Sequence, residues 1–128
     1  MRAALTPEQL IADLTEQLRK QPLVLTALLF DSHASGRSRP DSDLDVAVWF
    51  GPAYGSMDAE EFRLTLSIDL MTRYGCPVDV VPLDQAPPFL KQQVFNRGVE
   101  LVVCDPDGWR AFRAKGYIEA LDFRHITA

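Results

Sequence analysis

The chain has 128 residues, a length typical of one compact core, so we expect residues 1–128 to form a single domain. Its 13 Lys and Arg against 18 Asp and Glu give a formal net charge of −5. This charge argues against direct nucleic-acid binding through a broad basic surface, and it suits a basic protein partner. No apolar stretch approaches the ~20 residues of a membrane helix. The amino terminus also lacks a basic segment followed by an apolar one, so we expect a cytoplasmic protein without membrane contact.

Helix caps and chain breakers divide the sequence into helices and strands. Thr6-Pro7-Glu8-Gln9 is typical of a helix start, because Thr caps the helix, Pro fits its first turn and Gln completes a capping box. Gly75 is placed to end a second long helix. The patterns predict helices from residue 7 to before Pro22, at 58–75, at 87–98 and from 105 onward, with strands at 23–30, 43–50, 76–83 and 99–103.

Two aspartates open the second predicted strand. Side chains at positions i and i+2 of a strand leave the same face, so Asp43 and Asp45 have Cα atoms roughly 6.5–7 Å apart and carboxylates on one side. Two such carboxylates repel each other unless a cation neutralises them, and a divalent ion suits that position. A lone Asp-x-Asp is also typical of a solvated strand start.

A third aspartate lies inside the third predicted strand. Asp79 stands between Val78 and Val80, and burying it unpaired would be costly. One interpretation is a buried carboxylate that shares a divalent site with Asp43 and Asp45. The other is an edge strand with Asp79 facing water. Nucleotidyl transfer often uses two Mg²⁺ ions about 3.5–4 Å apart, and three carboxylates can supply ligands for them.

The full motif runs from Ser32 through ten residues to Asp43-Leu44-Asp45, with Arg39-Pro40-Asp41-Ser42 leading in and a hydrophobic-Asp-hydrophobic strand downstream. This arrangement resembles the minimal nucleotidyltransferases of the DNA polymerase beta superfamily. It is most similar to their antitoxin branch, in chain length and in the aromatic pattern at residues 117–123. Members of that branch pair with a HEPN-domain ribonuclease toxin. The resemblance implies an α+β polymerase-beta-like fold, with a mixed sheet of about four strands flanked by helices.

The resemblance also assigns roles to individual residues. It makes Asp43, Asp45 and Asp79 the catalytic metal ligands, with Asp79 serving the attacking hydroxyl. It gives nucleotide contacts to Ser32, Gly36, Arg39 and Ser42.

Three of the nucleotide assignments have simpler alternatives. Ser32 at the amino end of a short helix can contact the triphosphate, or it can only cap that helix. Arg39 can pair with a phosphate or be solvated, and Ser42 can orient the carboxylates or cap the loop.

One position departs from the family pattern next to the motif serine. Relatives have Gly there, whereas this chain has Asp31. A carboxylate and a Cβ at that point are unfavourable beside an anionic ligand, so we expect weaker nucleotide binding. Ser35 also replaces a common Arg, for which Arg37 can substitute.

The function implied by the resemblance is Mg²⁺-dependent transfer of AMP from ATP to a tyrosine hydroxyl of a cognate HEPN toxin, within a hetero-oligomer. This activity would make the protein an adenylyltransferase and an antitoxin. The principal alternative, which Asp31 favours, is an antitoxin that neutralises its partner by binding alone. Nucleotidyl transfer to a small molecule of the aminoglycoside type is a third possibility, for which the chain has little room.

The last predicted helix carries a stripe of large apolar side chains. Such a stripe is usually buried against its own domain, although it can also be a docking surface. Its members are Trp109, Phe112, Tyr117 and Leu121.

Overall fold

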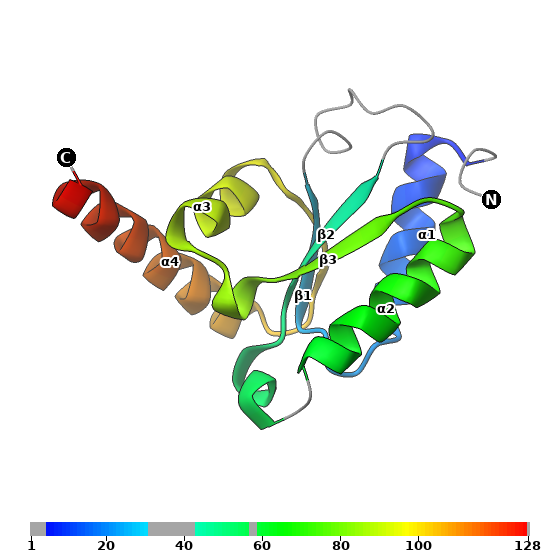
Figure 1. The fold of residues 1–128 in the computed structure, drawn as a ribbon, viewed down its shortest axis with the longest axis horizontal. Helices are drawn as coiled ribbons and strands as arrows, with labels where there is room; N and C mark the ends of the chain where they lie inside the picture. The colour runs from blue at the N-terminus through cyan, green and yellow to red at the C-terminus, as the bar shows by residue number, and fades with distance from the viewer. Residues whose placement is uncertain (1–4, 31–42, 57–58, 128) are drawn as a thin grey trace.

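The computed structural model describes residues 5–30, 43–56 and 59–127 (Figure 1). The order of helices and strands is the one predicted from the sequence, with two short 3-10 helices in addition. The elements are α1 (Pro7–Arg19), β1 (Thr26–Phe30), β2 (Leu44–Trp49), η3 (Gly51–Ser56), α2 (Ala59–Tyr74), β3 (Val78–Pro82), η4 (Leu83–Gln85), α3 (Pro88–Arg97), β4 (Val99–Val103) and α4 (Pro106–Thr127).

The strands form one mixed sheet in the order β3-β2-β1-β4. β1 is antiparallel to both β2 and β4, whereas β2 and β3 are parallel. The predicted α+β class, with a mixed four-stranded sheet flanked by helices, is therefore confirmed. β3 lies at one edge of this sheet, and α2 is the connection that returns the chain from β2 to β3.

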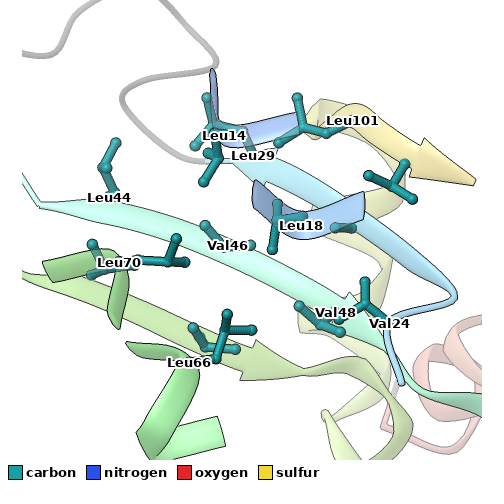
Figure 2. Close-up of a cluster of buried hydrophobic side chains, with 14 of the residues drawn as sticks. Leu14, Leu18, Val24, Leu29, Leu44, Val46, Val48, Leu66, Leu70 and Leu101 are labelled. Atoms are coloured by element: carbon teal, nitrogen blue, oxygen red, sulfur yellow. The ribbon is translucent and has the colours of Figure 1, made fainter. Parts of the chain in front are cut away.

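Helices α1 and α2 lie on one side of the sheet, and α3 and α4 lie on the other (Figure 1). Figure 2 shows the larger core, in which leucines of α1 and α2 pack onto alternate residues of the strands. Leu44, Val46 and Val48 of β2 all face this core and are fully buried. The alternation fixes the opposite face for Asp45, Ala47 and Trp49.

The second core is largely aromatic and joins the other sheet face to α3 and α4. Trp109 of α4 is buried, and its ring centroid lies 5.8 Å from that of Trp49 and 5.9 Å from that of Phe112. The Tyr117 hydroxyl donates to Asn96 Oδ1 at 2.6 Å and ties α4 to α3. The predicted burial of the stripe is thus confirmed for Trp109. It is wrong for Leu121, which is 61% exposed.

Two helix ends that were predicted from local sequence, the start of α1 and the end of α2, are confirmed. Thr6 Oγ1 accepts from the Gln9 N–H at 3.1 Å, and the Thr6 N–H donates to Gln9 Oε1 at 2.9 Å, which completes the capping box. Gly75 follows α2 with φ of 68°, a conformation that favours glycine.

Within the part of the chain that the structure describes, no helix combines the length and apolar character needed to cross a membrane.

A polar cluster ties α1 to α2 beside the larger core. Asp13 of α1 accepts two hydrogen bonds from Arg73, both at 2.7 Å, and a third at 2.7 Å from the Tyr74 hydroxyl. The bonds from Arg73, and to a smaller extent the one from Tyr74, lower the pKa of Asp13 to about 2. Burial and the neighbouring Asp13 raise the pKa of Tyr74.

The Asp13→Asn variant should lose about 1–2 kcal/mol of unfolding free energy at pH 7. This is less than the whole pKa shift corresponds to, because Arg73 is 37% exposed. In the wild type the contribution of Asp13 is complete above its unfolded pKa of 3.8 and is lost as the pH falls towards the folded value of about 2. Urea unfolding at pH 7 and pH 3 measures both effects.

Glu16→Gln is the matched control on the same helix, since Glu16 is largely exposed and lies 3.9 Å from Lys20. It should change stability by less than about 0.5 kcal/mol. An equal loss in both variants would contradict the role given to the Asp13 cluster.

Candidate active site

The candidate site lies where β2 begins beside β3. Asp45 is the register partner of Asp79 across the parallel pair, so the two side chains leave the same face from strands about 4.8 Å apart. Asp43 precedes β2 by one residue and is exposed. The backbone therefore brings Asp45 and Asp79 to one face of the sheet, and it places Asp43 at the same end.

This face is the one that carries the second core further along the strands. Asp45 is paired on its other side with Phe30 of β1, which packs at the margin of the second core. Asp45 is partly buried and has interactions within the structure. The carboxylates thus stand where the apolar layer under α3 and α4 ends.

Asp79 is exposed because β3 is the edge strand of the sheet. Its neighbours Val78 and Val80 point into the larger core, and Asp79 points away from it. The interpretation of Asp79 as a buried carboxylate is wrong, and the edge-strand alternative is correct. Asp79 is thus both exposed and adjacent to Asp45, so its carboxylate is accessible from outside the molecule.

Arg63 of α2 places a positive charge near this edge. It bonds Glu60 at 2.5 Å and 3.1 Å, and its Nη1 lies 3.5 Å from the carbonyl oxygen of Val80. The hydrogen bond to Glu60, with a smaller contribution from the charge of Asp79, raises the pKa of Arg63. The sequence analysis missed Arg63 and Phe30, since neither residue carries a signal before the strand register is known.

One further carboxylate, Asp84 in η4, has a structural role. It accepts from the backbone N–H groups of Phe50 and Gly51, both at 2.9 Å, where Gly51 turns the chain with φ of 72°. Burial raises its pKa, and the two backbone bonds act in the opposite direction. Asp84 therefore fixes the far end of β2.

Three carboxylates at one end of the sheet supply the hard oxygen donors that Mg²⁺ prefers. Among residues 5–30, 43–56 and 59–127, however, no three His, Cys, Asp or Glu side chains gather closely enough to hold a metal ion. Backbone placement and donor chemistry fit the ion, while the side chains are not gathered around a common point. The metal assignment of Asp43, Asp45 and Asp79 therefore stays a prediction.

The four predicted nucleotide contacts fall outside the described residues, as do Asp31, Ser35 and Arg37. Their assignments also stay predictions. The four are Ser32, Gly36, Arg39 and Ser42.

Residues 12–107 match the family described as polymerase beta, nucleotidyltransferase. No curated protein gives a significant match to the sequence. Because the match spans most of the chain, the protein belongs to the polymerase beta nucleotidyltransferase family.

Solved structures of toxin–antitoxin complexes share the fold. A chain of the tri-AMPylated Shewanella oneidensis HEPN toxin in complex with MNT antitoxin has 23% identity and a TM-score of 0.70, and the match covers 94% of this chain and 89% of that one. A toxin–antitoxin structure with AMP-PNP has 24% identity and a TM-score of 0.69, over 91% and 88%. The MntA–HepT toxin–antitoxin has 25% identity and a TM-score of 0.65, over 91% and 86%.

If the three aspartates bind Mg²⁺, the ion should raise the melting temperature of the wild type above its value in EDTA. At ten times its dissociation constant the ion adds about 1.4 kcal/mol, which corresponds to a shift of several degrees. Asp45→Asn and Asp79→Asn should each reduce this shift. Differential scanning fluorimetry over a Mg²⁺ series measures it.

Asp69→Asn is the control, because Asp69 is an exposed carboxylate on α2, which packs on the sheet face opposite to the one that Asp45 and Asp79 leave. It should keep the wild-type response to Mg²⁺. A wild-type shift that persists in both site variants would contradict the metal assignment.

Proposed function

We propose that this protein is a Mg²⁺-dependent adenylyltransferase, which transfers AMP from ATP to a tyrosine hydroxyl of a HEPN-domain toxin and acts as its antitoxin. The observation that carries the proposal is the pairing of Asp45 with Asp79 at an accessible sheet edge, in a chain of the nucleotidyltransferase family. Support comes from relatives of the same fold, one with AMP-PNP and one with a tri-AMPylated HEPN toxin.

The three carboxylates have different positions, and this suggests different roles. Asp43, just before β2, and Asp45 on β2 would hold Mg²⁺ at the nucleotide, and Asp79 on β3 would join them as a ligand on the acceptor side. Bound there, the ion supplies neutralisation of triphosphate charge and a lower pKa for a nearby hydroxyl. Asp79 is the carboxylate on the open edge, and it therefore faces the direction from which a protein hydroxyl can approach.

In the proposed reaction the acceptor oxygen attacks the α-phosphorus of ATP. The bond from that phosphorus to the bridging oxygen breaks, pyrophosphate leaves, and the hydroxyl proton passes to solvent. The described residues contribute charge and position. Ser32, Gly36, Arg39 and Ser42 would orient the nucleotide, as the family resemblance implies. The whole of residues 1–128 would act as one domain in complex with the toxin.

Incubation of the protein with ATP, Mg²⁺ and the HEPN-domain protein of the same genome tests the proposal. Intact mass spectrometry should show that the HEPN protein gains one or more AMP units. Asp43→Asn and Asp45→Asn should abolish transfer while circular dichroism shows the wild-type fold. Asp79→Asn should lower kcat with little change in ATP affinity, because it serves the acceptor side. Wild-type transfer rates in folded Asp45→Asn would contradict the catalytic assignment.

The second candidate function is neutralisation of the toxin by binding alone. It is favoured by Asp31, and by the fact that the described carboxylates do not form a group of three around a common point. An Asp31→Gly variant separates the two functions. It should bind MgATP severalfold more tightly, because it removes a repulsion of roughly 1 kcal/mol between charges about 4 Å apart.

Calorimetric titration of MgATP at two salt concentrations measures this gain, which should shrink at high salt. Equal affinities would show that Asp31 does not face the phosphates. Neutralisation of the toxin by a wild type that does not bind MgATP would establish the binding-only function.

A further inference from the structure

Arg97 ends α3 close to the candidate site. It is the last residue of α3 and is exposed, and Val99, two residues later, pairs with Leu29 of β1. The next residue of β1, Phe30, pairs with Asp45. Because α3 packs on the sheet face that Asp45 leaves, Arg97 lies at the same end of the sheet as the site and on the same face (Figure 1).

Close packing fixes the point at which α3 ends. Gly98 follows Arg97, and its N–H donates to the carbonyl oxygen of Val94 at 2.8 Å. A Cβ at Gly98 would lie 2.6 Å from that oxygen and 3.1 Å from Cδ2 of Leu28. The helix therefore ends directly against β1, and tertiary packing sets the position of the Arg97 backbone beside the sheet.

Arg97 has no acidic partner among the side chains that the structure describes. In this respect it differs from most of the described cations of a chain with a net charge of −5. Arg19, the last residue of α1, and the exposed Lys115 are likewise outside the ion pairs of the described chain. The guanidinium of Arg97 is thus free to bind an anion that comes from outside. The paired cations are Lys20, Arg63, Arg73, Lys91, Arg110 and Arg113.

The sheet places Asp79 and Arg97 on opposite sides of Asp45. In the strand order β3-β2-β1-β4, Asp79 is one strand away from Asp45, and α3 leads into β4, two strands away in the other direction. Because neighbouring strands are about 4.8 Å apart, β4 lies roughly 10 Å from β2 across the sheet. A group bound at Asp45 therefore has a carboxylate on one side and an unpaired guanidinium on the other.

An in-line displacement at phosphorus has the same two-sided geometry. The acceptor oxygen forms its bond to the α-phosphorus on one side, and the bond to the bridging oxygen breaks on the other. That oxygen keeps the electron pair and leaves with pyrophosphate. If the acceptor enters at the open edge beside Asp79, the outer phosphates extend from Asp45 towards the end of α3. Negative charge grows there as the bond breaks, and arginine is well suited to bind it.

We propose that Arg97 binds the β- and γ-phosphates of ATP and the pyrophosphate that leaves. The inference rests on the proposed function, since it assigns a further residue to the same reaction. A cation in the last turn of a helix can also act only on the helix dipole. Arg19 has that position in α1, on the other face of the sheet, and it is exposed and unpaired like Arg97 (Figure 1). It therefore provides a control of the same residue type, helix position and charge.

The test compares Arg97→Gln with Arg19→Gln in calorimetric titrations with MgATP and with magnesium pyrophosphate. We expect Arg97→Gln to weaken the binding of both about tenfold, because it removes one charge-assisted contact with the outer phosphates. Arg97→Lys should recover part of this affinity, since it restores the charge without the planar fork. Arg19→Gln should leave both affinities within twofold of the wild type, and circular dichroism should show the wild-type fold in all variants.

Steady-state transfer to the HEPN-domain protein provides a second readout. Arg97→Gln should lower kcat and raise KM for ATP, with KM for the HEPN protein unchanged. Phosphate binding and transfer that are equal in Arg97→Gln and Arg19→Gln would overturn the role of Arg97 and leave the adenylyltransferase function standing. Pyrophosphate binding that depends on Arg97 without any AMP transfer would support the phosphate contact and refute that function. A wild type that binds neither MgATP nor pyrophosphate would refute both.

Discussion

The parallel pairing of β2 with β3 is the constraint on which the candidate site depends. Parallel neighbours cannot be joined by a tight turn, so the chain must cross over, and α2 provides this crossover. The apolar side of α2 is buried in the larger core and holds β3 in register. That register alone places Asp79 beside Asp45. A change in the core under α2 would therefore alter the site without touching any carboxylate.

Placing like charges on adjacent strands costs folding free energy, and other parts of the structure must offset that cost. The two cores supply most of the compensation, because each face of the sheet is covered by two helices (Figure 1). The hydrogen bonds of Asp13 with Arg73 and Tyr74 add a polar link between α1 and α2. Acidic residues thus occupy two separate places in this fold, one where Asp13 links two helices and one where Asp45 and Asp79 lie side by side on neighbouring strands.

Local chemistry in the sequence was sufficient to predict the start of α1, the end of α2 and the order of helices and strands along the chain. Capping boxes and i, i+2 spacing act within a few residues, so a single sequence contains them completely. Burial of Asp79 was not predictable in the same way, because a strand such as Val78–Pro82 has the same apolar pattern at an edge as in the middle of a sheet. The register that pairs Asp45 with Asp79 and with Phe30 is likewise a property of tertiary structure.

The edge position of Asp79 also bears on how an acceptor is chosen. A carboxylate buried in the middle of the sheet could serve only a small substrate that enters a pocket, whereas an exposed one can be reached by a hydroxyl on a large partner. Three aspartates have no means of distinguishing one hydroxyl from another, since they recognise only charge and oxygen. Selectivity must then come from surface away from the reacting atoms, where differences between partners are larger.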